Sequence, residues 1–252
     1  MSNQLDKGKL GEDFIHQIAF DSFLKFWCYP NPKDEYGDQK EICDLLIVFN
    51  DTAIIVCVKN YEFKGTYNKY FRKTIEKDIR QLSGAERKLT DKKTSLFIKH
   101  PDKEIEEYKK NSIKKICRII VHLGDNVRFY PLRGKTNNGK FVHIFDRETF
   151  RTIFSELDTI PDFIEYLEKK EEAFNNTFAV VLPKDEYDFD SMTADQFKEY
   201  SFLNSIDDVQ KYVLISGTEF DLLAHYLVNN RQMPGHLISQ KYGWLFLQID
   251  GA

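Results

Sequence analysis

The chain has 252 residues, of which 42% are hydrophobic, so it is long enough for one large domain or two smaller ones with a sizeable core. No run approaches the ~18 apolar residues of a membrane helix and no signal-peptide stretch begins the chain, so we expect a cytoplasmic protein without a membrane partner. The net charge of −4 hides a division, because residues 1–149 carry 28 Lys and Arg against 22 Asp and Glu, whereas residues 150–252 carry 8 against 18.

Apolar spacing and turn residues predict the first elements in chain order. A helix is predicted from about residue 8 to 25, and the Pro, Gly and Asn residues that follow predict a loop over 28–40. Two apolar runs, 41–49 and 52–59, predict strands. Their link, Asn50-Asp51, is short, which favours an antiparallel hairpin.

Beyond the hairpin, one apolar face predicts a helix over 71–89. The polar stretch 101–112 is expected to form at most a short helix. Strands are predicted at four apolar stretches: 94–100, 115–123, 127–131 and 141–145. This order of elements, with mixed strand pairing, predicts a three-layered α/β domain.

The character of the chain changes near residue 147, and we place a domain boundary near 150, which gives domains of 1–149 and 150–252. The second is predicted to be a smaller, acidic α/β domain. It opens with two helices that are broken at Thr159-Ile160-Pro161, where Asp158 or Thr159 can cap the second helix. The later elements are a strand at 178–183, an acidic connector, a short helix at 194–203, a strand at 212–217, a helix at 218–230 and a strand at 244–249.

Asp44 is a carboxylate inside an apolar run, where burial of a lone charge is costly. We therefore expect it to face a metal, a partner charge or solvent. The hairpin brings Asp44 close to Cys57 across the ladder, and Cys57 and Lys59 share one face of the second strand. An ordinary Asp–Lys pair at a strand edge would also fit this spacing.

The neighbouring residues add to this arrangement. Glu12 stands on the first helix, and Gln81 stands on the helix after the hairpin. In this order of elements, residues 8 to about 125 resemble the PD-(D/E)xK superfamily, which has the restriction-endonuclease-like fold. The stretches CDLLIVF and QLSGAER are also similar to stretches in a set of bacterial proteins. The resemblance implies a three-layer core with a mixed sheet.

The resemblance also implies a chemistry, the hydrolysis of phosphodiester bonds with Mg²⁺ or Mn²⁺ as cofactor. Asp44 would be the central metal ligand and Lys59 the catalytic lysine. Glu12 would assist with metal or water, and Gln81 would contact the phosphate or position Lys59. By the same analogy, the substrate is expected to be DNA rather than RNA, and the biological role is expected to lie in restriction or defence. The analogy also allows a homodimer.

Cys57 departs from the family pattern, which has a carboxylate two residues before the lysine. A thiol is a poor Mg²⁺ ligand because soft sulfur prefers other metals. Glu41 or Glu62 could replace the missing acid, although strict strand alternation puts Glu41 on the opposite face from Asp44 unless the strand ends or bulges there. Otherwise Asp44 and Glu12 bind one metal weakly, or the fold is catalytically inactive and binds nucleic acid or protein.

A basic stretch follows the hairpin. Residues 59–93 hold 11 Lys and Arg against 5 acids, interleaved with aromatic residues. Such a stretch is typical of a phosphate-backbone contact, although a solvated helix face has the same composition. The predicted nucleic-acid-binding residues are Lys64, Arg72, Lys73, Lys77 and Arg80. His16, one helical turn after Glu12, could join the site, although a surface position is favoured, and the four cysteines are expected to be reduced and buried.

Overall fold

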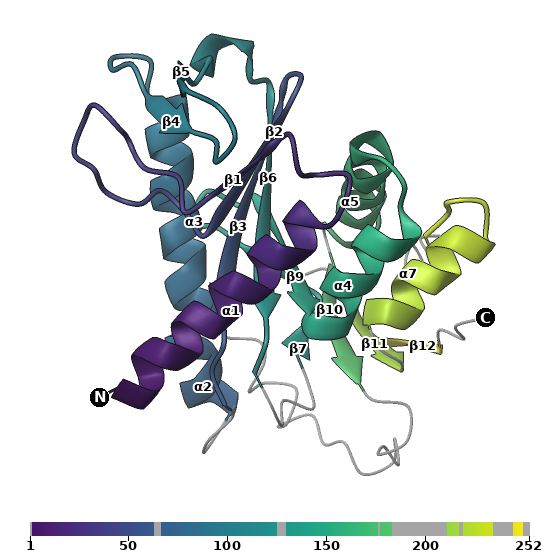
Figure 1. Cartoon of the computed structure of the whole chain (residues 1–252). Coiled ribbons are helices and arrows are strands. Elements are labelled where there is room, and N and C mark those ends of the chain that lie inside the picture. The colour runs from purple at the N-terminus through teal and green to yellow at the C-terminus, as the bar shows by residue number, and fades with distance from the viewer. Residues whose placement is uncertain are drawn as a thin grey trace.

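The computed structural model describes residues 2–62, 67–124, 130–175, 177–182, 211–216, 219–233 and 244–248. Its larger sheet consists, in spatial order, of β1 (Cys28–Pro30), β2 (Leu45–Phe49), β3 (Thr52–Lys59), β6 (Lys115–His122), β9 (Phe141–Asp146) and β8 (Arg133–Lys135) (Figure 1). The β3–β6 and β6–β9 pairs are parallel and the others antiparallel. The prediction of an α/β protein with a mixed sheet is therefore confirmed.

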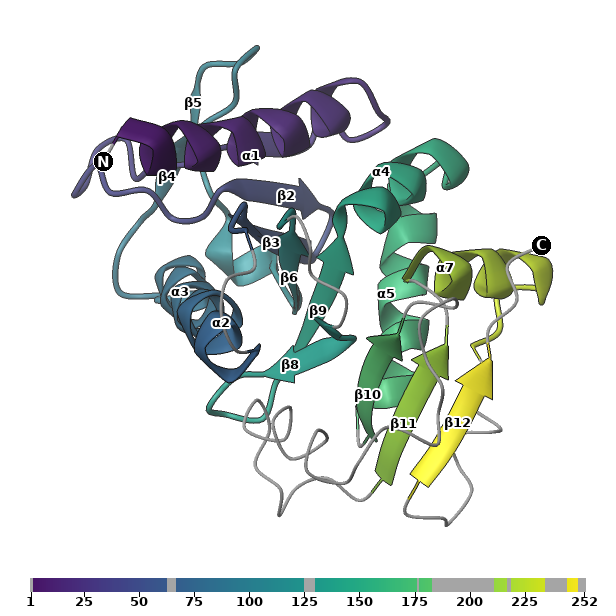
Figure 2. The same cartoon turned by 90° about the horizontal axis from the view of Figure 1, so that it is seen from below.

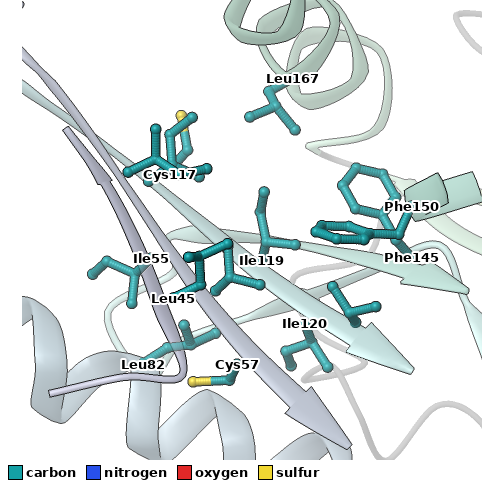
Figure 3. Close-up of a cluster of buried hydrophobic side chains, with 14 of the residues drawn as sticks. Leu45, Ile55, Cys57, Leu82, Cys117, Ile119, Ile120, Phe145, Phe150 and Leu167 are labelled. Carbon is teal, nitrogen blue, oxygen red and sulfur yellow. The ribbon is translucent and has the colours of Figure 1, made fainter. Parts of the chain in front are cut away.

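Helices cover both faces of this sheet (Figure 2). The helix α1 (Ser2–Phe20) crosses one face, and α2 (Tyr67–Lys73) and α3 (Ile75–Thr90) lie on the other. Strand alternation in β3 explains the division, since Val58 faces α1 while Cys57 and Lys59 face α3. Cys57 and Ile55 lie near Leu82 of α3 in the core (Figure 3).

The bounds of several elements differ from the predicted ones. The first helix ends at Phe20, because residues 21–27 form turns that carry the buried Leu24 into the core. The predicted helix over 71–89 is two helices, interrupted at Thr74, whose hydroxyl donates to the carbonyl of Tyr70 at 2.9 Å. Such side-chain bonds to the preceding turn favour helix bending.

Short strands were missed by the sequence patterns. The predicted loop 28–40 contains β1, whose Cys28 pairs with Ile47 of β2. The stretch 101–112 is a strand and a short 3₁₀ turn rather than a helix: β4 (Phe97–Lys99) pairs with β5 (Ile105–Glu107), and η1 (Lys110–Ser112) follows. A three-residue strand is too short to show the period-two pattern on which strand prediction depends.

A second sheet contains, in spatial order, β12 (Trp244–Gln248), β11 (Lys211–Ser216), β10 (Thr177–Leu182) and β7 (Tyr130–Pro131). Of the helices in this part of the chain, α4 (Arg147–Glu156) packs on β9 and β6 of the larger sheet, α5 (Ile160–Phe174) contacts both β9 and β10, and α7 (Glu219–Val228) packs on α4. Thr159 caps α5 by accepting from the backbone N–H of Asp162, as predicted. The pairing of β7 with β10 joins a segment before residue 150 to one after it, and the domain boundary stays a prediction.

The predicted connector and short helix between 184 and 203 lie outside the described residues. In the described ranges, no helix is both long and apolar enough to cross a membrane. All four cysteines are buried and free, which agrees with the prediction made for them.

Candidate active site

A cleft of about 560 Å³ opens where β3 ends and α1 crosses it. Its walls come from four segments that are far apart in the chain. The lining residues are Lys7, Gly8, Glu12, Glu41, Asp44, Val58, Lys59, Asn60, Tyr61, Glu62 and Gln81. The structure therefore brings together Glu12, Asp44, Lys59 and Gln81, as well as both acids considered as replacements for the one missing at Cys57.

Asp44 lies at a bend immediately before β2, not inside the strand. One carboxylate oxygen accepts a hydrogen bond of 2.5 Å from the backbone N–H of Val58. The backbone carbonyl of Asp44 accepts from His16 Nε2 at 2.8 Å and from the backbone N–H of Asn31 at 3.0 Å. His16 is thus partly buried and supports the site, which is the less favoured of the two positions considered for it.

The bend at Asp44 also decides the place of Glu41. Residue 41 forms an isolated bridge with Lys33 before β2 begins, so strand alternation does not apply to it. The Glu41 side chain reaches the cleft, which Asp44 also lines, while staying accessible to solvent. Partial burial, Asp44 and Glu12 together raise the pKa of Glu41 to about 7. Burial likewise raises the pKa of Asp44, against the opposing effects of the Val58 N–H and Lys59.

Glu12 is positioned by its neighbour in α1, Gly11. A Cβ atom at residue 11 would lie 3.1 Å from the Asn60 side chain and 3.3 Å from that of Val58, so the missing side chain lets α1 approach β3 closely. Asn31, in the left-handed region with a φ of 43°, donates from Nδ2 to Glu12 Oε2 at 3.3 Å. Asn31 therefore joins the Glu12 side chain to the Asp44 backbone.

Lys59 is held from the side of α3. Its Nζ lies 2.8 Å from Asp78 Oδ1 and donates to Gln81 Oε1 at 3.3 Å. Burial lowers the pKa of Lys59, but the carboxylates of Asp78 and Asp44 raise it by more. Sequence reasoning missed Asp78, although there was a signal: it is an acid on the apolar face of α3, between Ile75 and Leu82.

Cys57 does not line the cleft. Its side chain is buried, and burial raises the pKa of the thiol well above its ordinary value. The charges of Asp44 and Asp78 also disfavour a thiolate, and Lys59 opposes them with a smaller effect. Cys57 is therefore a neutral core residue beneath the site and neither a ligand nor a nucleophile.

The predicted nucleic-acid-binding residues fall on α2 and α3. Arg72 and Lys73 in α2, and Lys77 and Arg80 in α3, are all exposed. Lys77 stands one helical turn before Gln81, on the cleft side of α3. Lys64 lies outside the described residues.

The electrostatics of the cleft favour a cation. Among the described residues, its walls carry four carboxylates, those of Glu12, Glu41, Asp44 and Glu62, and two ammonium groups, from Lys7 and Lys59. Within the described part of the chain, however, no three or more His, Cys, Asp and Glu side chains form a ready group of metal ligands. The coupled Glu41–Asp44 pair, with Glu12 close enough to influence it, is therefore a partial set of oxygen ligands.

Comparison with known proteins gives no match: no family model matches the sequence, and neither a curated protein nor a solved structure is significantly similar to it.

Proposed function

We propose that the protein is a metal-dependent nuclease with a restriction-endonuclease-like core, which hydrolyses phosphodiester bonds in DNA. The proposal is carried by one observation, the convergence of Glu12, Glu41 and Asp44 on a cleft that also contains Lys59. Oxygen ligands and a cation at one position are what phosphodiester hydrolysis requires.

The ligand set is compatible with Mg²⁺ or Mn²⁺. Mg²⁺ commonly takes one or two protein carboxylates and completes its shell with water and substrate phosphate, so a preformed cage of three is not needed. Glu41 and Asp44 would be the direct ligands, and Glu12, held by Asn31, would bind the metal or a water molecule. When bound, the metal polarises the phosphate and activates water.

The remaining residues act on the phosphate. The Lys59 side chain is 15% exposed and lines the cleft, where its ammonium group can offset charge that develops on the phosphate oxygens. Gln81 accepts a hydrogen bond from Lys59 through Oε1, which leaves its amide N–H groups to donate to a phosphate. Both side chains therefore supply donors on the wall opposite the carboxylates.

The exposed basic residues of α2 and α3 support a polyanionic substrate. Lys73, Lys77 and Arg80 continue from the Gln81 side of the cleft along the helix surface. Contacts of this kind bind the phosphate backbone and carry no sequence information. The proposal therefore covers DNA as a class and no particular sequence.

A second function is favoured by a different observation, the buried thiol of Cys57 together with the absence of a ready three-ligand group among the described residues. On that reading, the fold binds nucleic acid through its basic helix surface and does not cleave it.

Cleavage assays distinguish the two functions. Supercoiled, linear and single-stranded DNA and an RNA would be incubated with wild-type protein in Mg²⁺, Mn²⁺ or EDTA, beside Lys59→Ala, Asp44→Asn and the exposed control Glu104→Gln. We expect divalent-dependent cleavage by wild type and the control, and none by the two cleft variants. Cleavage that Lys59→Ala and Asp44→Asn both retain, or its absence on every substrate, would overturn the nuclease proposal.

A further inference from the structure

We infer that Asp78, a residue outside the cleft wall, is the positioning residue of Lys59. This inference rests on the proposed function for its catalytic consequence, but its structural part concerns the Lys59 side chain alone. It assigns Asp78 to the site, although no metal or substrate could touch its fully buried side chain.

The geometry places Asp78 on the side of Lys59 where an acid at residue 57 would stand. Residues 57 and 59 share one face of β3, and that face is covered by α3. Asp78 reaches this position from α3, with Oδ1 2.8 Å from Lys59 Nζ, and it is close enough to Cys57 to disfavour a thiolate there. The strand therefore supplies the lysine and the helix supplies its counter-charge.

Stability alone does not account for Asp78. Its neighbours along the buried face of α3 are apolar, and an apolar residue there would avoid the desolvation of a carboxylate. Replacing a buried ion pair by apolar residues is often neutral or stabilising. Among the described residues, neither carboxylate oxygen has a well-aligned hydrogen bond, so the ion pair with Lys59 is the main compensation for its charge.

The pair has a consequence for Asp44. Lys59 is also attracted to the Asp44 carboxylate, because the two interact electrostatically across the cleft. Without Asp78, the flexible lysine side chain would turn toward Asp44 and neutralise the oxygens that the proposed metal needs. Asp78 holds the ammonium against α3, where Gln81 also accepts from it, and leaves the Asp44 oxygens free to bind a cation.

The test uses Asp78→Asn, which keeps the size of the side chain and removes its charge, and Asp78→Glu, which restores a carboxylate. The first readout does not need activity: the pH dependence of Lys59 acetylation, followed by mass spectrometry, reports the lysine's protonation. We expect Lys59 to become reactive at lower pH in Asp78→Asn and to return toward wild type in Asp78→Glu. An unchanged Lys59 titration in a folded Asp78→Asn protein would overturn the inference.

The second readout is cleavage. We expect Asp78→Asn to lower kcat on the order of 100-fold with little change in KM, since a misplaced catalytic group has an effect of this size. Asp78→Glu should recover part of this loss, because it restores a carboxylate beside Lys59. A kcat in Asp78→Glu as low as that of Asp78→Asn would assign Asp78 a different role. If neither the wild type nor any variant cleaves DNA, the proposed function fails. The acetylation experiment then still decides whether Asp78 controls the protonation of Lys59.

Discussion

The side chains of Glu41 and Asp44, three residues apart in the chain, both line the cleft. Two acids so spaced would face opposite ways in a regular strand, but the bend at Asp44 turns both toward the cleft. The Asp44 charge adds to the burial that raises the pKa of Glu41, as expected for carboxylates that share one site. Such a pair is poised to exchange its proton for a metal ion.

Glu41 is therefore predicted to be essential although no strand pattern singles it out. Glu41→Gln should lower divalent-dependent cleavage by at least about 100-fold, since even the outer partners of metal ligands contribute 10- to 100-fold. Initial rates on plasmid DNA at saturating Mn²⁺ would measure the loss. Glu62→Gln, on the rim of the same cleft, is the matched comparison, and an equal loss in both variants would contradict a special role for Glu41.

Divalent-ion binding should depend on pH through Glu41. Its pKa in the folded protein is about 7, above its ordinary 4.5, so the group is mostly protonated at pH 6 and mostly ionised at pH 8. Because the metal competes with the proton, we expect Mn²⁺ affinity to rise about tenfold from pH 6 to pH 8. Calorimetric titration with Mn²⁺ would measure it. The rise should be much smaller in Glu41→Gln, and an unchanged slope there would assign the proton to another group.

Much of the hairpin could be predicted from sequence because its signals are local. The predicted strand 52–59 matches β3 in full, since an apolar run followed by a lysine marks both its burial and its end. The Thr159 cap was equally readable, because capping depends on residues three apart. The proximity of Asp44 and Lys59 followed from the hairpin, whereas Glu12 and Gln81 were expected at the site only from the resemblance to the PD-(D/E)xK superfamily.

The other parts of the site depend on tertiary contacts. The bend that brings Glu41 to Asp44 is stabilised by His16 and by the backbone N–H of Asn31, which are distant in sequence. Asp78 lies on the face of α3 whose sequence pattern predicts a hydrophobic core. Only the packing of α3 on β3 brings the Lys59 ammonium next to its carboxylate. Neither the bend at Asp44 nor the Asp78–Lys59 pair can be predicted from a local sequence pattern.

DNA binding should require a divalent cation if the cleft is the binding site. Four carboxylates against two lysines repel a phosphate, and a bound divalent ion removes that excess. We expect an oligonucleotide to bind at least about tenfold more tightly in Ca²⁺ than in EDTA, measured by fluorescence anisotropy. In Asp44→Asn the difference should shrink. Equally tight binding in EDTA would favour the inactive binding protein, which depends on the basic helix surface alone.

That surface can be tested by its salt dependence. Lys73→Ala, Lys77→Ala and Arg80→Ala should each weaken DNA binding for all sequences alike, and each should reduce the slope of log K against log salt by about 1. Lys92→Ala, an exposed lysine just beyond the far end of α3, is the control and should change neither quantity. If the control behaves like the other three, the helix surface contributes only through its overall charge.

The orientation of α3, and with it of Asp78 and Gln81, depends on a buried ion pair. Arg118 of β6 donates to both Glu86 oxygens, at 2.7 and 2.6 Å, and Lys140 donates to one of them at 2.6 Å. Glu86→Gln would leave Arg118 buried without its counter-charge, so we expect a loss of about 3–5 kcal/mol in the free energy of unfolding at pH 7. The exposed pair between Asp51 and Lys114 is the control, where Asp51→Asn should lose less than about 1 kcal/mol.

The same substitution has a predicted pH signature. Burial alone would raise the pKa of Glu86, but Arg118 and Lys140 hold it below its ordinary 4.5. The stabilisation by this group is therefore present above pH 4.5 and is lost as the pH falls through the lowered pKa, because wild type then also carries a neutral side chain. Urea unfolding at pH 7 and at pH values below 4.5 should show the gap between wild type and Glu86→Gln narrowing toward acid. A gap that stays constant would mean that packing of the side chain, and not its charge, anchors α3 to the sheet.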